Sequence, residues 1–72
     1  MPDELQTVLA AVGPRLRALR KHRGVTLEQL ATSTKISVST LSRLESGQRR
    51  ATLELLLPIA RVHDVPLDDL DL

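Results

Sequence analysis

The 72 residues suit one small domain spanning 1–72, and the 42% of apolar residues are nearly all Leu, Val, Ile and Ala. The absence of Phe, Tyr, Trp and Cys excludes aromatic platforms for stacking single-stranded nucleic acid, disulfides and thiolate metal sites. The net charge of +1 is unevenly distributed along the chain. Nine of the ten Lys and Arg residues lie between positions 15 and 50, but only two of the nine acidic residues do. This stretch therefore carries a charge of +7, and the segments on either side of it are acidic.

Apolar residues at helical spacing lie on both sides of Gly13-Pro14 in the N-terminal part of the chain. They are Leu5, Val8, Leu9 and Val12 before it and Leu16 and Leu19 after it. Because proline is tolerated in the first turn of a helix, this pattern predicts a short leading helix near residues 3–12 and a second helix from residue 14 to about 22. A single helix kinked at the proline is the alternative.

Two short helices with strong start signals follow. Thr26 and Gln29 form a capping-box pattern, in which each side chain can bond to the backbone N–H of the other, and this pattern predicts a helix from residue 27 to about 33. Ser37 is a good N-cap for a further helix over residues 38–46. Only a few residues separate the two helices, so the turn between them must be tight.

The C-terminal part of the chain predicts two more helical segments. Thr52 is placed as the N-cap of a helix over residues 53–63, which is apolar nearly all round and is therefore expected in the middle of a helical bundle. Pro58 lies inside this helix and should bend it, since its nitrogen cannot donate a hydrogen bond. A final helical turn begins at Pro66.

Residues 26–46 are thus two short, capped helices joined by a tight turn, a pattern that is typical of a helix-turn-helix unit. The second helix of such a unit can lie in the major groove of DNA. Leu41 and Leu44 must face the core, so the opposite face of the helix is left open to a duplex. That face carries Val38, Ser39, Ser42 and Arg43.

The residue types on this face suit base recognition. Small hydroxyl side chains let a helix approach closely and can bond to base edges or phosphates, Arg43 can contact guanine O6 and N7 together, and Val38 can touch a thymine methyl group. The same small polar residues would be tolerated on the solvent face of a purely structural helix. The basic stretch around this helix is likewise consistent with contact to a polyanion or with a solvated surface.

Four runs of the sequence resemble the XRE family, which has the Cro/C1-type phage repressor fold. They are residues 15–31 (RLRALRKHRGVTLEQLA), 36–47 (ISVSTLSRLESG), 52–56 (TLELL) and 65–67 (VPL). The resemblance covers about residues 13–70 and implies an all-α, λ-repressor-like domain of five helices, with a short extra helix at its N-terminus. It further implies a transcriptional regulator that binds specific double-stranded DNA sequences, with the helix over 38–46 as the recognition helix.

Site residues are carried over from the family by position. Val38, Ser39, Ser42 and Arg43 match base contacts. Thr26, Leu27, Ser37, Thr40, Arg49 and Arg50 match phosphate contacts. Arg20 and Glu45 match a structural ion pair between the first and third helices. The chain departs from the family pattern at Lys35, where a turn glycine is common, at Asp64, where the fourth helix usually ends in glycine, and at Leu27, where a polar residue is common.

One recognition helix reads only a few base pairs, which are too few to specify a genomic site. Two copies are expected to bind DNA as a homodimer through exposed apolar residues of the fourth helix and the C-terminal turn. The runs GPRLR at 13–17 and LLLP at 55–58 are similar to a subset in which a cupin-type sensor domain follows the DNA-binding domain, so such a C-terminal domain is expected in a longer protein. The acidic start of the chain and its short apolar runs predict neither a signal peptide nor a membrane span, and hence a cytoplasmic protein.

Other functions have weaker support in the sequence. No nucleophile motif or Gly-rich phosphate loop is present, His22 and His63 are expected at the surface, and an enzyme, a cofactor and a metal site are therefore not expected. The acidic residues near the C-terminus lack calcium-loop spacing. Two alternatives remain: a helical protein-interaction module that uses the fourth helix with Leu67, Leu70 and Leu72, and an antitoxin that binds both DNA and a toxin.

Overall fold

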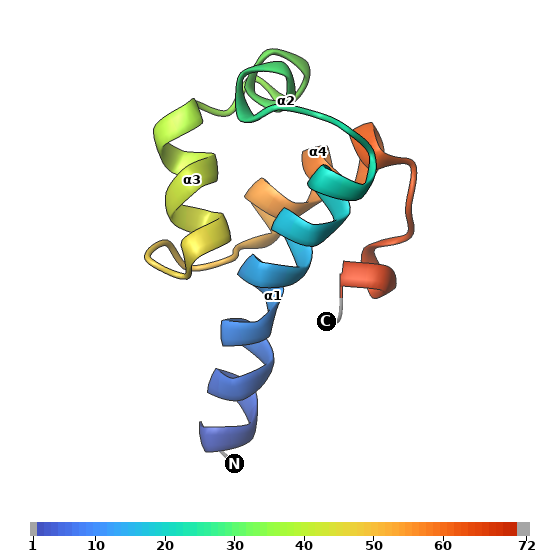
Figure 1. The fold of residues 1–72 in the computed structure, drawn as a ribbon. Coiled ribbons are helices and arrows are strands. Elements are labelled where there is room, and N and C mark those ends of the chain that lie inside the picture. The colour runs from blue at the N-terminus through green and yellow to red at the C-terminus, as the bar shows by residue number, and fades with distance from the viewer. Residues whose placement is uncertain (1, 71–72) are drawn as a thin grey trace.

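The computed structural model describes residues 2–70 and is all-helical over that range (Figure 1). In chain order the elements are α1 (Pro2–His22), α2 (Leu27–Thr34), α3 (Val38–Ser46), α4 (Leu53–His63) and the short 3-10 helix η1 (Leu67–Leu70). The predicted all-α class is confirmed. The number of helices is smaller than expected, because the leading helix is not separate and the last turn is a 3-10 helix.

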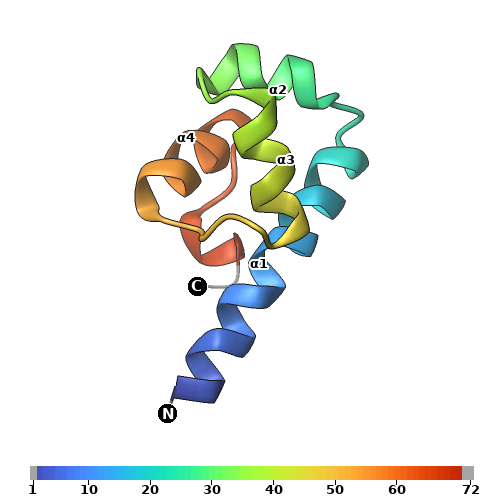
Figure 2. The ribbon, with the colours of Figure 1, turned by 90° about the vertical axis from the view of Figure 1, so that its left-hand side faces the viewer.

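α1 continues through Gly13-Pro14, so the alternative of a single helix is the correct one and the prediction of two helices is wrong. A continuous helix keeps Val12 and Leu16, four residues apart, on one buried face, which outweighs the backbone hydrogen bond that the proline removes. The N-terminal half of α1 extends beyond the rest of the domain, while the C-terminal half packs beside α3 (Figures 1 and 2).

The start signals of the two short helices are confirmed. The Thr26 hydroxyl accepts a bond of 3.0 Å from the Gln29 N–H, and the Gln29 side chain accepts one of 3.0 Å from the Thr26 N–H. At the start of α3 the Ser37 hydroxyl accepts a bond from the Thr40 N–H at 3.1 Å. Between the helices Lys35 has a φ of 62°, so this non-glycine residue does adopt the left-handed conformation that ends α2.

α4 differs from its prediction in two respects. Thr52 occupies the N-cap position, but its side chain makes no capping hydrogen bond, and the helix start rests on the bonds of the Leu55 and Leu56 N–H groups to the Thr52 carbonyl. The helix is also not buried all round, because Leu53 and Leu57 are 57% and 41% exposed. Only one face of α4 meets the other helices, and the exposed part of its apolar surface is not covered by any residue that the structure describes.

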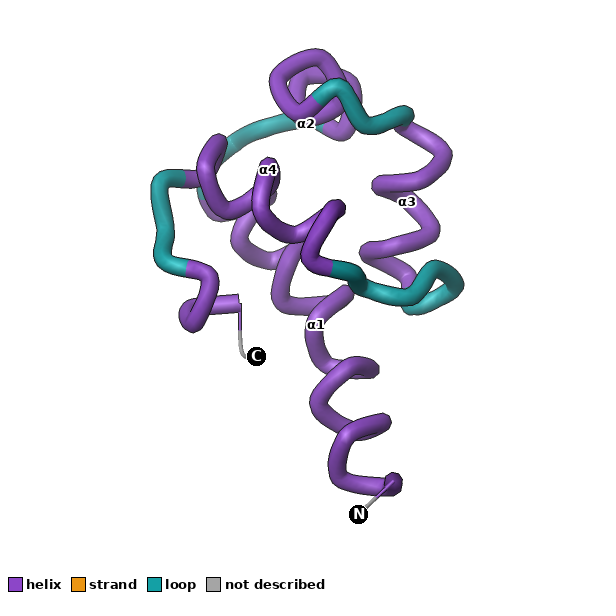
Figure 3. The backbone as a smooth tube through the Cα atoms, turned by 180° about the vertical axis from the view of Figure 1, so that it is seen from behind, coloured by secondary structure: helices purple, strands orange, loops and turns teal. Residues whose placement is uncertain are grey.

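A single apolar core lies between α1, α2, α3 and α4, with η1 against its lower edge (Figures 1 and 3). Its buried members are Val12, Leu16, Leu30, Leu41, Leu44, Leu56, Ile59, Ala60 and Leu70. Leu70 is therefore not part of an exposed C-terminal surface, contrary to expectation, because η1 folds back onto α1 and α4 and places this leucine in the core. Leu72 lies outside the described residues.

Candidate nucleic-acid interface

α3 presents a polar face to solvent and an apolar face to the core. Leu41 and Leu44 are buried, whereas all four residues expected to contact bases are exposed. These four are Val38, Ser39, Ser42 and Arg43. The helix lies along one side of the molecule with α2 above it, so nothing in the described part of the chain covers this face (Figure 2). The arrangement permits the polar face of α3 to approach a duplex.

The residues expected to contact phosphates fall into two groups. At the helix starts the hydroxyls of Thr26 and Ser37 are already engaged in capping, and Ser37 also donates a bond of 2.9 Å to the Thr40 hydroxyl. Leu27 is half-buried and packs against the core, so it can offer a phosphate only its backbone N–H. Arg49 and Arg50 are exposed in the loop after α3, where their guanidinium groups can reach a DNA backbone.

The orientation of α3 relative to α1 is fixed by the ion pair of Arg20 and Glu45. The guanidinium donates from Nε to Oε2 at 2.8 Å and from Nη2 to Oε1 at 3.0 Å, and both side chains are largely buried, with 11% and 6% exposure. The third nitrogen, Nη1, donates to the Val25 carbonyl at 2.9 Å. The hydrogen bond to Glu45 raises the pKa of Arg20. One arginine thus joins α1, α3 and the loop that leads into α2.

Sequence reasoning missed Arg17, which lies beside α3 without being part of that face. Its side chain lines a hollow together with Ser42 and Ser46 of α3. A signal was present, because Arg17 is three residues before Arg20 and therefore shares with it the side of α1 that turns toward α3.

His63 was expected at the surface and is instead buried, with 1% exposure. It follows Leu56 and Ile59 at helical spacing and so belongs to the buried face of α4, a periodicity that could have revealed its position. Its Nε2 has no hydrogen-bond partner in the described part of the chain. Burial lowers the pKa of His63, and the positive charge of Arg23 lowers it further, so the ring is held neutral in the folded domain.

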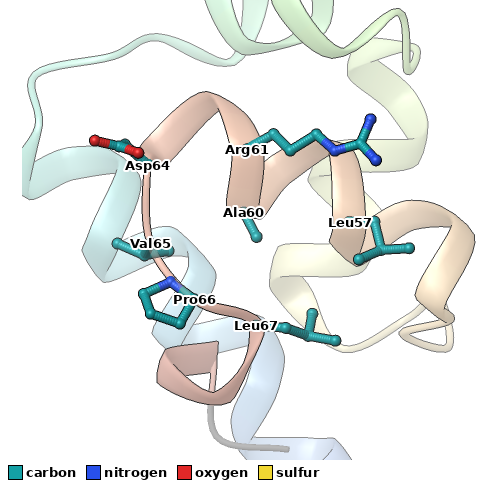
Figure 4. Close-up of a pocket in the computed structure, with 7 residues that line it drawn as sticks. All are labelled: Leu57, Ala60, Arg61, Asp64, Val65, Pro66 and Leu67. Atoms are coloured by element: carbon teal, nitrogen blue, oxygen red, sulfur yellow. The ribbon is translucent and has the colours of Figure 1, made fainter.

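An open groove lies on α4 and the segment that leads from it to η1 (Figure 4). Its lining residues are Leu57, Ala60, Arg61, Asp64, Val65, Pro66 and Leu67. None of them belongs to α2 or α3, so this groove is separate from the candidate nucleic-acid interface. Asp64 has a φ of 55° and ends α4 in the left-handed conformation where the family usually has glycine.

The described residues contain neither a metal-ligand cluster nor a membrane-spanning helix. No group of three or more His, Cys, Asp or Glu side chains stands in an arrangement that could hold a metal ion within the part of the chain that the structure describes. Over the same part, no helix combines the length and the apolar character needed to cross a membrane.

Comparison with known proteins shows the family. The helix-turn-helix family model HTH_3 matches residues 16–70. The HTH-type transcriptional regulator DdrOP3 of Deinococcus deserti is 41% identical over 56 residues, and the match covers 78% of this chain but only 43% of that regulator. The chain thus spans less than half the length of this curated relative.

Two solved structures have a similar fold. The restriction-modification controller protein C.AhdI from Aeromonas hydrophila has a TM-score of 0.81 at 34% identity, over 86% of this chain and 94% of that one. The clp gene regulator ClgR from Corynebacterium glutamicum has a TM-score of 0.81 at 33% identity, over 88% of this chain and 67% of that one. The capped α2–turn–α3 unit, the family match and these similarities agree, and the chain belongs to the HTH_3 family, the XRE-type helix-turn-helix domains of transcriptional regulators.

Proposed function

We propose that this domain binds double-stranded DNA in a sequence-specific manner, with α3 in the major groove. The observation that carries the proposal is the exposed polar face of α3, held in place by the buried pair of Arg20 and Glu45. A recognition helix must keep a fixed orientation for its side chains to meet base edges, and a bidentate pair between α1 and α3 supplies that rigidity. The transcriptional-regulator names of the relatives agree with this function.

Under this proposal the contacts divide by chemistry. Arg43 reads guanine through two hydrogen bonds, Ser39 and Ser42 bond to base edges, and Val38 meets a thymine methyl group. Phosphates are bound by the guanidinium groups of Arg49 and Arg50, by the starts of α2 and α3 around Thr26, Leu27 and Ser37, and by Thr40.

One recognition helix reads too few base pairs to specify a genomic site, so the proposal includes two copies on DNA. A two-fold axis would place the two α3 helices in major-groove segments about 10 base pairs apart. The exposed apolar residues Leu53 and Leu57 of α4 supply a surface for that dimer. Such a protein regulates transcription where the chromosome lies, in the cytoplasm of a prokaryotic cell.

Selection from random double-stranded DNA with the purified chain tests the proposal. The expected result is an enriched inverted repeat that contains guanines, bound with an affinity that falls steeply as salt is raised. Single-stranded DNA of the same sequence serves as the control and should bind weakly, because the chain contains no aromatic residue for base stacking. Selection that enriches no sequence, or binding that is indifferent to salt, would contradict sequence-specific DNA binding and favour a protein-interaction role.

A further inference from the structure

A small hollow with a volume of about 210 Å³ lies where α1, α2 and the C-terminal half of α3 meet. Its lining residues are Arg17 and Arg20 of α1, Leu27 of α2, and Ser42, Glu45 and Ser46 of α3. A second hollow adjoins it on the α1 side and shares Arg17, Glu45 and Ser46 with it, while adding Lys21. Arg17 therefore stands between two depressions at the edge of the exposed face of α3.

Among the described residues, Arg17 is a cation without a partner. It is exposed, and its side chain forms no hydrogen bond or ion pair with any residue that the structure describes. The same holds for Lys21, one helical turn further along α1, and for the hydroxyl of Ser42. These groups are free to bind a ligand that carries negative charge and accepts hydrogen bonds.

The other charges in the hollow do not oppose an anion. Glu45 is neutralised by two hydrogen bonds from Arg20, and the remaining donor nitrogen of Arg20 is engaged by the Val25 carbonyl. The pair is therefore close to neutral as a unit, and Arg17 and Lys21 leave an excess of two positive charges at the rim. Leu27 forms an apolar wall that competes for no hydrogen bond.

We propose that Arg17 binds a phosphate of the DNA backbone at the edge of the major groove that receives α3. This inference rests on the proposed function. The major groove of B-DNA is about 12 Å wide and a helix with its side chains is about 10–12 Å across, so an element beside the inserted helix meets the phosphates at the rim of the groove. α1 is that element on this side of α3, and Arg17 lines the same hollow as Ser42.

The contact positions the protein and does not read sequence. Phosphates are identical at every step of a duplex, so Arg17 adds affinity to all sequences alike and sets the angle at which α3 enters the groove. One hydrogen bond between charged groups raises the binding affinity about tenfold, which is large enough to measure.

The test measures binding of the selected duplex over a series of salt concentrations for wild-type protein and three variants. Arg17→Gln should weaken binding about tenfold and lower the salt slope by about one unit, with sequence preference unchanged. Arg17→Lys should keep most of the slope, because a lysine still offers a point charge to a phosphate. Arg15→Gln removes the same charge from the same helix. Arg15 lies about 160° around α1 from Arg17, so this variant should leave the salt slope unchanged.

The outcomes separate the two proposals. If wild-type protein binds the duplex and Arg43→Ala relaxes its preference at one or two guanines, but Arg17→Gln has the affinity and slope of wild type, the phosphate contact is wrong and the proposed function stands. If Arg15→Gln and Arg17→Gln lower the slope equally, the effect is diffuse charge and the contact is also wrong. If wild-type protein binds no duplex, both proposals fail.

Discussion

Gly13 on α1 lies directly against the carbonyl oxygen of Leu44 near the end of α3. A Cβ atom at Gly13 would stand 2.5 Å from that oxygen and 2.8 Å from the carbonyl oxygen of Glu45, both of them backbone atoms that cannot move aside as a side chain could. The absence of a side chain at this position thus allows α1 to pack closely on the helix that carries the proposed DNA contacts.

Gly13→Ala should therefore destabilise the domain by about 1–3 kcal/mol, because the added methyl group forces α1 and α3 apart. Helix propensity alone predicts the opposite sign, since alanine is favoured over glycine inside a helix by about 1 kcal/mol. Urea unfolding monitored by far-UV circular dichroism decides between them. A variant that is more stable than wild type would show that the close approach is not maintained in solution.

Removing Glu45 should be costly because it leaves the Arg20 guanidinium buried without its partner. Glu45→Ala is expected to lower the free energy of unfolding by about 3–5 kcal/mol. The exposed Glu54 provides the matched control, and Glu54→Ala should change stability by less than about 0.5 kcal/mol. Thermal and urea unfolding check this prediction. If both variants lose the same free energy of unfolding, the pair of Arg20 and Glu45 contributes as little to stability as an ion pair at the surface.

His63 should make the stability of the domain depend on pH. Its pKa is lowered in the folded state by burial and by Arg23, whereas in the unfolded chain it has the ordinary value of about 6.5. The unfolded chain thus binds the proton more readily, and stability is complete above about pH 6.5 and decreases as the pH falls below that value. Arg20 and Glu45 also act on the ring, with opposite effects on its pKa.

Urea unfolding of His63→Leu between pH 7.5 and 5 checks this prediction. The variant should lose most of the pH dependence seen in wild type, and its stability at pH 7.5 should not fall much, because leucine removes a buried nitrogen that has no partner. His22→Gln changes an exposed histidine and should keep the wild-type pH dependence. If His63→Leu retains the full decrease in stability below pH 6.5, other groups are responsible for it.

Arg43 and Arg50 should respond differently in DNA binding. Arg43→Ala is expected to cost about 1–3 kcal/mol on the selected site and to relax the preference at one or two guanines. Arg50→Ala should weaken binding to all sequences alike and reduce the salt slope by about one unit. Exchanged signatures would mean that Arg43 binds a phosphate and Arg50 enters the minor groove. If neither variant changes affinity or preference, α3 is not the recognition helix.

The proposed dimer can be tested on α4. Leu57→Glu introduces a charge into the exposed row that Leu57 shares with Leu53, and it should abolish cooperative binding to an inverted repeat while leaving the affinity for a single half-site nearly unchanged. Val62→Glu is the control, since Val62 is also exposed but lies on the side of α4 opposite Leu53. Cooperativity that survives Leu57→Glu would place the interface elsewhere.

Local signals in the sequence predicted α2 and α3 to within one residue. The capping residues Thr26 and Ser37 each accept a bond from an N–H group three residues away, so their effect can be predicted without knowledge of the fold. The polar face of α3 followed from the same reasoning, because Leu41 and Leu44 leave only one side of so short a helix exposed. The pairing of Arg20 with Glu45 came from the family resemblance and not from spacing.

The continuity of α1 and the position of His63 were decided by packing. The low helix propensity of Gly13 and Pro14 predicts a break in the helix, yet burial of Val12 and Leu16 favours an unbroken helix. The polar side chain of His63 predicts a position at the surface, yet His63 belongs to the buried face of α4. The proximity of Arg17 to Ser42 cannot be read from one helix alone, because the two residues are distant in the chain and lie on different helices.

Capping residues and helical periodicity act over a few residues, so the bounds of α2 and α3 could be predicted from the sequence. The family resemblance also rested on short runs of the sequence. Only the packing of whole helices placed Gly13 against the backbone of Leu44. Packing also set how closely Arg17 borders the exposed face of α3 and how completely His63 is enclosed, although helical spacing indicated the side of the helix on which each residue lies. Each of these depends on the distance between two helices that are far apart in the chain, and that distance is set by how the whole core packs.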